Sequence, residues 1–148
     1  MCGIVAVMRR GVGRARPVGS AVLASAEQAR EITASAPADL TALAGALDRA
    51  GALLAEIDGD LRGAPGLHFL IDASDAVPAL DKVIASIEDE VAVIEAAFDR
   101  AAAVLPEVTP GAEMESINAG LIRVKDLCWA IRHDRLQTAA EEIGRAHV

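Results

Sequence analysis

The sequence predicts a mainly α-helical fold, with antiparallel helical hairpins or a bundle joined by heptad-like seams, preceded by one short N-terminal β-strand. Apolar residues recur at alternating steps of three and four along three long segments, which is typical of helices that bury one face. Aromatic residues make up only 2% of the chain. The core must therefore consist of aliphatic side chains and alanine, which suits closely packed helices better than sheets.

The N-terminal part of the chain contains the predicted strand and the first helix. Residues 3–8 form an apolar run that is typical of a buried strand. Residues 9–19 contain three glycines and Pro17 and are predicted to form a loop. Helical periodicity begins at about residue 20 and continues to about residue 35, with Val22, Leu23, Ala26, Ala29 and Ile32 on one side.

The second helix is predicted over about residues 38–61. Pro37 is tolerated at a first helical turn, and Asp39 would add favourable negative charge there. The seam of this helix consists of Leu40, Leu43, Leu47, Ala50, Leu54, Ile57 and Leu61. The next five residues, Arg-Gly-Ala-Pro-Gly at 62–66, predict a stop and a turn. The pattern does not assign the short apolar piece 67–72 to a helix or a strand.

Two further helices complete the predicted bundle. The third begins after an N-cap at Ser74 or Asp75 and extends to about Leu105. The fourth covers about residues 112–142. Their seams are Leu80, Ile84, Ile87, Val91, Ile94, Phe98, Ala101 and Leu105, and then Met114, Ile117, Leu121, Val124, Cys128 and Ile131. Short turns between such helices predict antiparallel neighbours, and the seams are also compatible with a homo-oligomer.

Charge and composition exclude several classes of partner. The net charge of −8 and the pI near 4.8 argue against nucleic acid or an anionic membrane surface. The basic residues Arg9, Arg10, Arg14 and Arg16 are few and lack aromatic neighbours, so a solvated loop is favoured over an anion site. No segment has the roughly 18 consecutive apolar residues of a membrane span. Two cysteines without a signal peptide indicate a cytoplasmic protein with no disulfide framework.

Most polar residues have a simple structural interpretation. The spacing of His68, His133 and His147 does not fit a metal site, and no cofactor is expected. Cys128 falls on a seam and is interpreted as a small core residue. The acidic run at 88–90 is interpreted as a solvated face. The segment 127–136 is rich in polar side chains, but surface ion pairs of Asp134 with its neighbours Arg132 and Arg135 would explain it.

Cys2 differs from these residues because its position gives it chemistry. Once Met1 is removed, it carries a thiol and a free α-amine on the same residue. A thiol titrates near pH ~8.5 and an α-amine near ~7.7–8.0, so the amine can act as a neighbouring base at neutral pH. Gly3 would permit close approach of a substrate. Catalytic use of Cys2 and a chance start on a small apolar strand both remain open on these residues alone.

The opening residues Met-Cys-Gly-Ile-Val-Ala-Val, at 1–7, closely resemble the start of class II glutamine amidotransferase domains, which are N-terminal-nucleophile hydrolases. The resemblance is greatest to the glutamine–fructose-6-phosphate aminotransferases, in which this domain is fused to sugar-isomerase domains. It implies that Cys2 attacks the side-chain amide of glutamine, that its α-amine is the general base through water, and that ammonia is released for a sugar phosphate acceptor such as fructose 6-phosphate.

The chain also departs from that family. It lacks the Arg-Gly-x-Asp-Ser-like turn of the glutamine pocket, and no oxyanion-hole or substrate-binding residue can be assigned. Residues 142–148 depart from the helical pattern and read as a translation of GAG ATC GGA AGA GCA CAC GTC, which resembles a short-read sequencing adapter. We therefore expect a truncated gene product with a non-native tail at 142–148.

The expected organisation has three parts: a nucleophile strand and loop at 1–16, a helical insertion at 17–141, and the tail. The resemblance implies a fragment of a glutamine-dependent aminotransferase that is itself inactive. The alternative is a non-catalytic helical bundle that mediates association through its seams.

Overall fold

The computed structural model describes residues 14–104 and 111–146. Every regular element in these ranges is a helix, which confirms the mainly α prediction. The predicted strand at residues 3–8 lies outside the described residues. The elements are α1 (Gly19–Ala34), α2 (Leu40–Leu61), α3 (Gly63–Asp72), α4 (Ala76–Val104), α5 (Ala112–Trp129), the π-helix η1 (Ala130–Leu136) and α6 (Gln137–Ala146).

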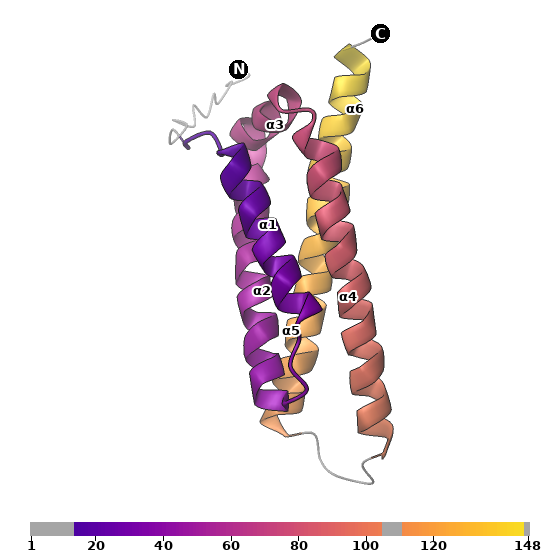
Figure 1. The fold of residues 1–148 in the computed structure, drawn as a ribbon. Coiled ribbons are helices and arrows are strands. Elements are labelled where there is room, and N and C mark those ends of the chain that lie inside the picture. The colour runs from indigo at the N-terminus through magenta and orange to yellow at the C-terminus, as the bar shows by residue number, and fades with distance from the viewer. Residues whose placement is uncertain (1–13, 105–110, 147–148) are drawn as a thin grey trace, which may run out of the picture.

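Two antiparallel hairpins lie side by side and form a four-helix bundle (Figure 1). The first hairpin is α1 and α2, and the second is α4 with the continuous rod of α5, η1 and α6. Helix α1 contacts both α2 and α4, and α5 also contacts α2 and α4. Helices α2 and α4 therefore occupy opposite corners, and α3 crosses the end of the bundle to connect them.

The predicted seams form the core. Aliphatic residues of α2, α4 and α5 are buried together with the alanines of α1 in one cluster. The largest fully buried side chains are Leu47, Leu54, Ile57, Leu70, Ile84, Ile87, Ile117 and Ile131, with Val91, Val124 and Cys128. Two predicted seam residues are exceptions: Leu40 at the start of α2 is 40% exposed, and Ala101 near the end of α4 is also exposed. Leu105 lies outside the described residues. The heptad pattern thus identified the buried face of each long helix.

The start of α2 differs slightly from the prediction. Asp39 lies just before the helix as its N-cap, and its carboxylate accepts a hydrogen bond of 2.9 Å from the backbone N–H of Ala42. An N-cap carboxylate satisfies one of the free N–H groups of the first turn. Pro37 therefore precedes the helix and does not belong to its first turn.

Helix α3 corrects the prediction of a turn at 62–66. The turn is confined to Arg62 and to Gly63, the first residue of α3. Gly63 has a φ of 71°, a left-handed conformation that favours glycine. Pro65 then fits the first turn of a new helix, where a missing N–H costs nothing. A Cβ at Gly66 would lie only 2.2 Å from the carbonyl carbon of Leu61. Glycine at 66 thus lets α3 fold closely onto the end of α2, and the unassigned piece 67–72 is helical.

The last helix also differs from the prediction. It contains the π-helical segment η1 and continues to Ala146, so the predicted break of the helical pattern at residue 142 is wrong. Residues 144–146 are exposed, and the helix extends past α3 at the end of the bundle (Figure 1).

Candidate functional site

The predicted nucleophile, Cys2, lies outside the described residues. The other cysteine, Cys128, is fully buried in the core. Burial raises the pKa of its thiol to about 12, with a further contribution from the nearby Glu88 carboxylate. The thiol is therefore protonated at neutral pH and unsuited to nucleophilic attack. This confirms the interpretation of Cys128 as a small core residue.

The π-helical segment η1 is the most distinctive local feature of the bundle. The buried seam of this rod runs through Ile117, Leu121, Val124, Cys128 and Ile131 in steps of three and four, and then takes a step of five to Leu136. An uninterrupted α-helix would place Arg135 at the next seam position. The i→i+5 bonding of a π-helix accommodates one extra residue. The segment thereby keeps Leu136 and Ala139 in the core.

Arg132 of η1 connects this rod to α4. Its guanidinium donates to the Asp81 carboxylate at 2.8 Å and to the Glu88 carboxylate at 2.5 Å. The Arg132 side chain is 28% exposed. The hydrogen bond to Asp81, followed by the one to Glu88, raises the pKa of Arg132 despite partial burial. Its charge is thus compensated by two carboxylates of one neighbouring helix.

Arg135 of η1 connects the same rod to α2. Its Nε donates to the Asp58 carboxylate at 2.9 Å, and Arg62 donates to the other oxygen of Asp58 at 2.8 Å. The Asp58 side chain is only 3% exposed. A carboxylate this deeply buried requires paired donors. Arg62 and Arg135 supply them, one to each carboxylate oxygen.

These contacts correct two interpretations from the sequence. Arg132 and Arg135 pair with carboxylates of α4 and α2, and neither pairs with Asp134 in the described part of the chain. Glu88 belongs to one of these interhelical pairs, so the acidic run 88–90 is not wholly a solvated face. Asp58 and Asp81 were not identified from the sequence. The five-residue step from Ile131 to Leu136 was the signal that could have located η1.

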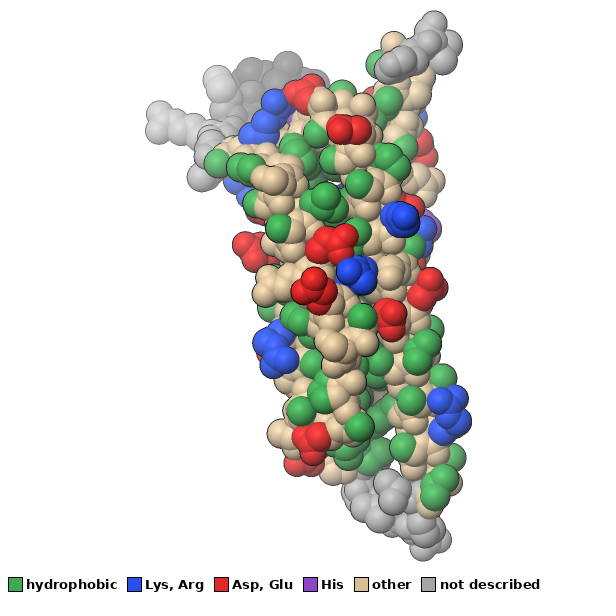
Figure 2. Space-filling view, in the orientation of Figure 1, with side chains coloured by type: hydrophobic (Ala, Val, Ile, Leu, Met, Phe, Trp, Pro, Cys, Tyr) green, Lys and Arg blue, Asp and Glu red, His purple; other side chains and the backbone are tan. Residues whose placement is uncertain are grey.

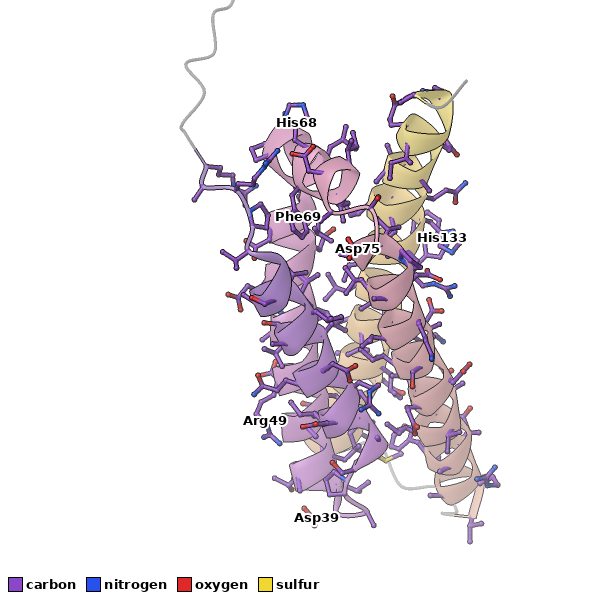
Figure 3. All side chains as sticks on the ribbon, turned by 45° about the horizontal axis from the view of Figure 1, so that its top comes forward. Asp39, Arg49, His68, Phe69, Asp75 and His133 are labelled. Carbon is purple, nitrogen blue, oxygen red and sulfur yellow. The ribbon has the colours of Figure 1, made fainter. Side chains whose placement is uncertain are left out.

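The histidines do not form a metal site in the described ranges. His68 is exposed on α3, and His133 lies on the outer side of η1 (Figure 3). The His133 ring lies 5.1 Å from the ring of Trp129, centroid to centroid. His147 lies outside the described residues. No group of three or more His, Cys, Asp or Glu side chains with metal-binding geometry occurs in residues 14–104 and 111–146.

Two of the four basic residues near the N-terminus, Arg14 and Arg16, lie in the loop before α1. Arg16 forms an ion pair of 2.5 Å with Asp72 at the end of α3, and both side chains are more than half exposed. An exposed pair of this kind contributes at most about 1 kcal/mol. Arg14 is exposed, while Arg9 and Arg10 lie outside the described residues.

A groove with mainly apolar walls opens where α1 ends. It has a volume of about 400 Å³ and lies between the α1–α2 connection and the second half of α4. Figure 2 shows hydrophobic side chains on both sides of this hollow, in the lower half of that face. Pro37, Leu40 and Leu43 line one wall, and Val93, Ile94 and Phe98 line the other. We call this feature the apolar groove.

The described residues do not assemble a catalytic constellation. Their buried thiol is protonated, and each buried or half-buried arginine of η1 is neutralised by carboxylates. The polar contacts of η1 instead connect three helices at one level of the bundle.

Comparison with known proteins found no match: no family model, no curated protein and no solved structure is similar to this chain. Within the described residues, none of the helices combines the length and apolar character needed to cross a bilayer.

Proposed function

We propose that this chain carries the catalytic cysteine of a glutamine amidotransferase together with a helical module that does not take part in the chemistry. The observation that carries the proposal is the Met-Cys-Gly-Ile-Val-Ala-Val opening, in which Cys2 becomes a nucleophile with its own amine as base after Met1 is removed. Ammonia released from glutamine would aminate a sugar phosphate such as fructose 6-phosphate in the cytoplasm.

The bundle supports the proposal that the helices form a separate module outside the chemistry. Among the described residues, its core cluster includes residues from Val22 to Ala139, so helices α1 to α6 share one continuous apolar interior. A module that closes its own core can follow the first strand of another domain as an insertion, because its folding does not depend on that domain's sheet.

The 148 residues alone are proposed to be inactive. Stabilisation of the oxyanion is usually the largest electrostatic contribution to acyl transfer, and the sequence contains no Arg-Gly-x-Asp-Ser turn that would complete a glutamine pocket. The remaining pocket would come from sequence encoded beyond codon 141, with residues 142–148 read from adapter DNA. Resequencing the gene tests this point, since native sequence continuing through codon 148 would contradict it.

Ammonia release from glutamine tests the activity. The product of the resequenced gene should hydrolyse glutamine, and the Cys2→Ala variant should lose this activity. The matched control is Cys128→Ala, which removes the buried thiol and should retain turnover. Cys2-dependent hydrolysis by the 148-residue chain alone would contradict its assignment as an inactive fragment.

A second candidate function is supported by the surface of the bundle. The apolar groove, with the exposed Val93 in its wall, is typical of proteins that bind a partner. In this alternative the bundle is a non-catalytic interaction module. Most of its predicted seam residues are buried in its own core, so association would use this surface and not the seams. Absence of glutamine hydrolysis by the wild-type product of the resequenced gene would favour it.

A further inference from the structure

The two hairpins differ in length, and this difference leaves one corner of the bundle incomplete. Helix α1 has 16 residues, whereas the neighbouring α4 has 29. At a rise of about 1.5 Å per residue, α4 is longer by roughly 20 Å. Where α1 ends, α4 therefore loses a neighbour along its second half, and the apolar groove marks this place.

Helix α4 carries a second row of residues at heptad spacing. Its core seam includes Val91, Ile94 and Phe98, and the residue before each of these belongs to the second row. We call the set Glu90, Val93, Ala97, Arg100 and Val104 the outer stripe. It is rotated by about 100° from the seam. Glu90, Val93 and Ala97 line the apolar groove, so the stripe borders the incomplete corner.

The apolar members of the outer stripe are unusually exposed for their position. Val93 is 64% exposed and Val104 is 79% exposed, and Leu40 on the facing wall of the groove is 40% exposed. Ala97 is exposed as well. Small side chains at the centre of such a row allow another helix to approach closely.

The charged members of the stripe are self-complementary. In an antiparallel pair of α4 helices centred on position 95, Glu90 of each copy faces Arg100 of the other, and Val93 faces Ala97. Neither Glu90 nor Arg100 forms an ion pair within the residues that the structure describes, and Glu90 has only a weaker electrostatic interaction with Arg30 of α1. A two-fold symmetric contact repeats each pair twice, which gives two charge pairs around an apolar centre.

We propose that the outer stripe of α4 is a homodimerisation surface, in which the α4 helix of a second copy packs antiparallel beside the apolar groove. A crossing angle, as in ridges-into-grooves packing, confines the contact to the part of the outer stripe between Glu90 and Arg100, so Val104 lies beyond it and the helix ends stay clear of the partner's α1. This contact involves few residues from each copy, so the dimer forms reversibly. The proposal does not depend on the chemistry of Cys2.

Sedimentation equilibrium of the full chain over a range of concentrations tests this proposal. The wild-type chain should show a reversible monomer–dimer equilibrium. The E90R variant places an introduced arginine opposite Arg100 of the second copy, and the R100E variant places an introduced glutamate opposite Glu90. Each single reversal should weaken dimerisation by about tenfold or more, because like charges then face each other twice.

The double variant E90R/R100E restores both pairs with reversed polarity and should recover dimerisation to within about threefold of the wild type. Net charge cannot produce this pattern, since E90R lowers the negative charge of the chain and R100E raises it. D99R is the matched control on the opposite flank of α4 and should dimerise like the wild type.

Three results would overturn the proposal: a wild-type chain that stays monomeric at all concentrations, a double variant as weak as the single variants, or D99R as weak as E90R. Circular dichroism of each variant confirms that the helices remain folded. Recovery in the double variant itself excludes misfolding as the cause of the single effects.

Discussion

Asp58 of α2 and Arg135 of η1 meet at 2.9 Å beneath the surface of the bundle, and this contact joins the two hairpins. Asp58 is almost fully buried, while Arg62 covers its other oxygen. The contact depends on the π-helical segment, which lets Arg135 face α2 while Leu136 stays in the core. A buried charge pair of this kind fixes the register between two helices.

Replacing Asp58 with alanine should reduce the free energy of unfolding by about 2 kcal/mol. The loss leaves the half-buried Arg135 without its partner, and removing one member of a buried pair is costly. Urea unfolding followed by circular dichroism measures it. The matched control is Asp48→Ala in the same helix, which removes an exposed pair of 3.3 Å with Arg123 and should cost less than about 1 kcal/mol. Equal costs for the two variants would contradict a special role for Asp58.

Deleting Asp134 should leave the bundle folded. The deletion removes the extra residue of η1, so a continuous α-helix can carry Ile131, Leu136 and Ala139 on one face at steps of four and three. Thermal unfolding should remain cooperative, with helicity close to that of the wild-type chain.

The control for this deletion is removal of the exposed Asn118 from α5. The seam of α5 contains no inserted residue, so this deletion rotates every later side chain by about 100° about the helix axis relative to the core. The core is then disrupted. Asn118 deletion should abolish cooperative unfolding. If both deletions unfold the chain equally, the one-residue interpretation of η1 is wrong.

The buried thiol of Cys128 should make stability fall at high pH. Its pKa is raised from 9.0 to about 12 in the folded state, so above pH 9 the unfolded chain loses this proton while the folded chain keeps it. The free energy of unfolding then decreases by up to about 1.4 kcal/mol per pH unit between pH 9 and 12. The stabilisation from the protonated, buried thiol is therefore fully present below pH 9. The free energy of unfolding is measured against pH for the wild type and for Cys128→Ala, and the difference between the two slopes isolates the contribution of the thiol. Identical slopes would refute this prediction.

Gly66→Ala should destabilise the chain by more than about 2 kcal/mol. The new Cβ would lie 2.2 Å from the carbonyl carbon and oxygen of Leu61, which belong to the backbone and cannot rotate away. Thermal unfolding measures the effect. Gly144→Ala is the matched control, because no atom lies within 4 Å of its new Cβ. It should be neutral or stabilising by up to about 1 kcal/mol, and a similar loss in both variants would contradict the close contact.

The heptad pattern predicted the long helices well because each of them buries one uninterrupted face. Leu47 and Leu54 in α2 and Ile84 and Ile87 in α4 lie in the core as their spacing indicates. Glycine and proline were less informative at 62–66. Gly63 does turn the chain, but Pro65 and Gly66 fit a helix once α3 folds onto α2, and this tertiary contact is invisible in the local sequence.

The polar contacts of η1 were not predicted because they depend on which helices are neighbours. The carboxylates that Arg132 binds, Glu88 and Asp81, lie 44 and 51 residues away in the sequence. Arg135 binds Asp58 across a separation of 77 residues. A sequence pattern gives the face of a helix but not the helix across from it. The step of five between Ile131 and Leu136 is the local sign that the register shifts.

Covalent capture by a chloroketone analogue of glutamine tests the central claim most directly. Intact-mass and peptide analysis of the resequenced gene product should show one adduct, located on Cys2, and excess glutamine should prevent it. Cys128 should remain unmodified because it is buried. An unmodified Cys2, or an adduct that glutamine does not prevent, would contradict the assignment of Cys2 as the nucleophile of a glutamine amidotransferase.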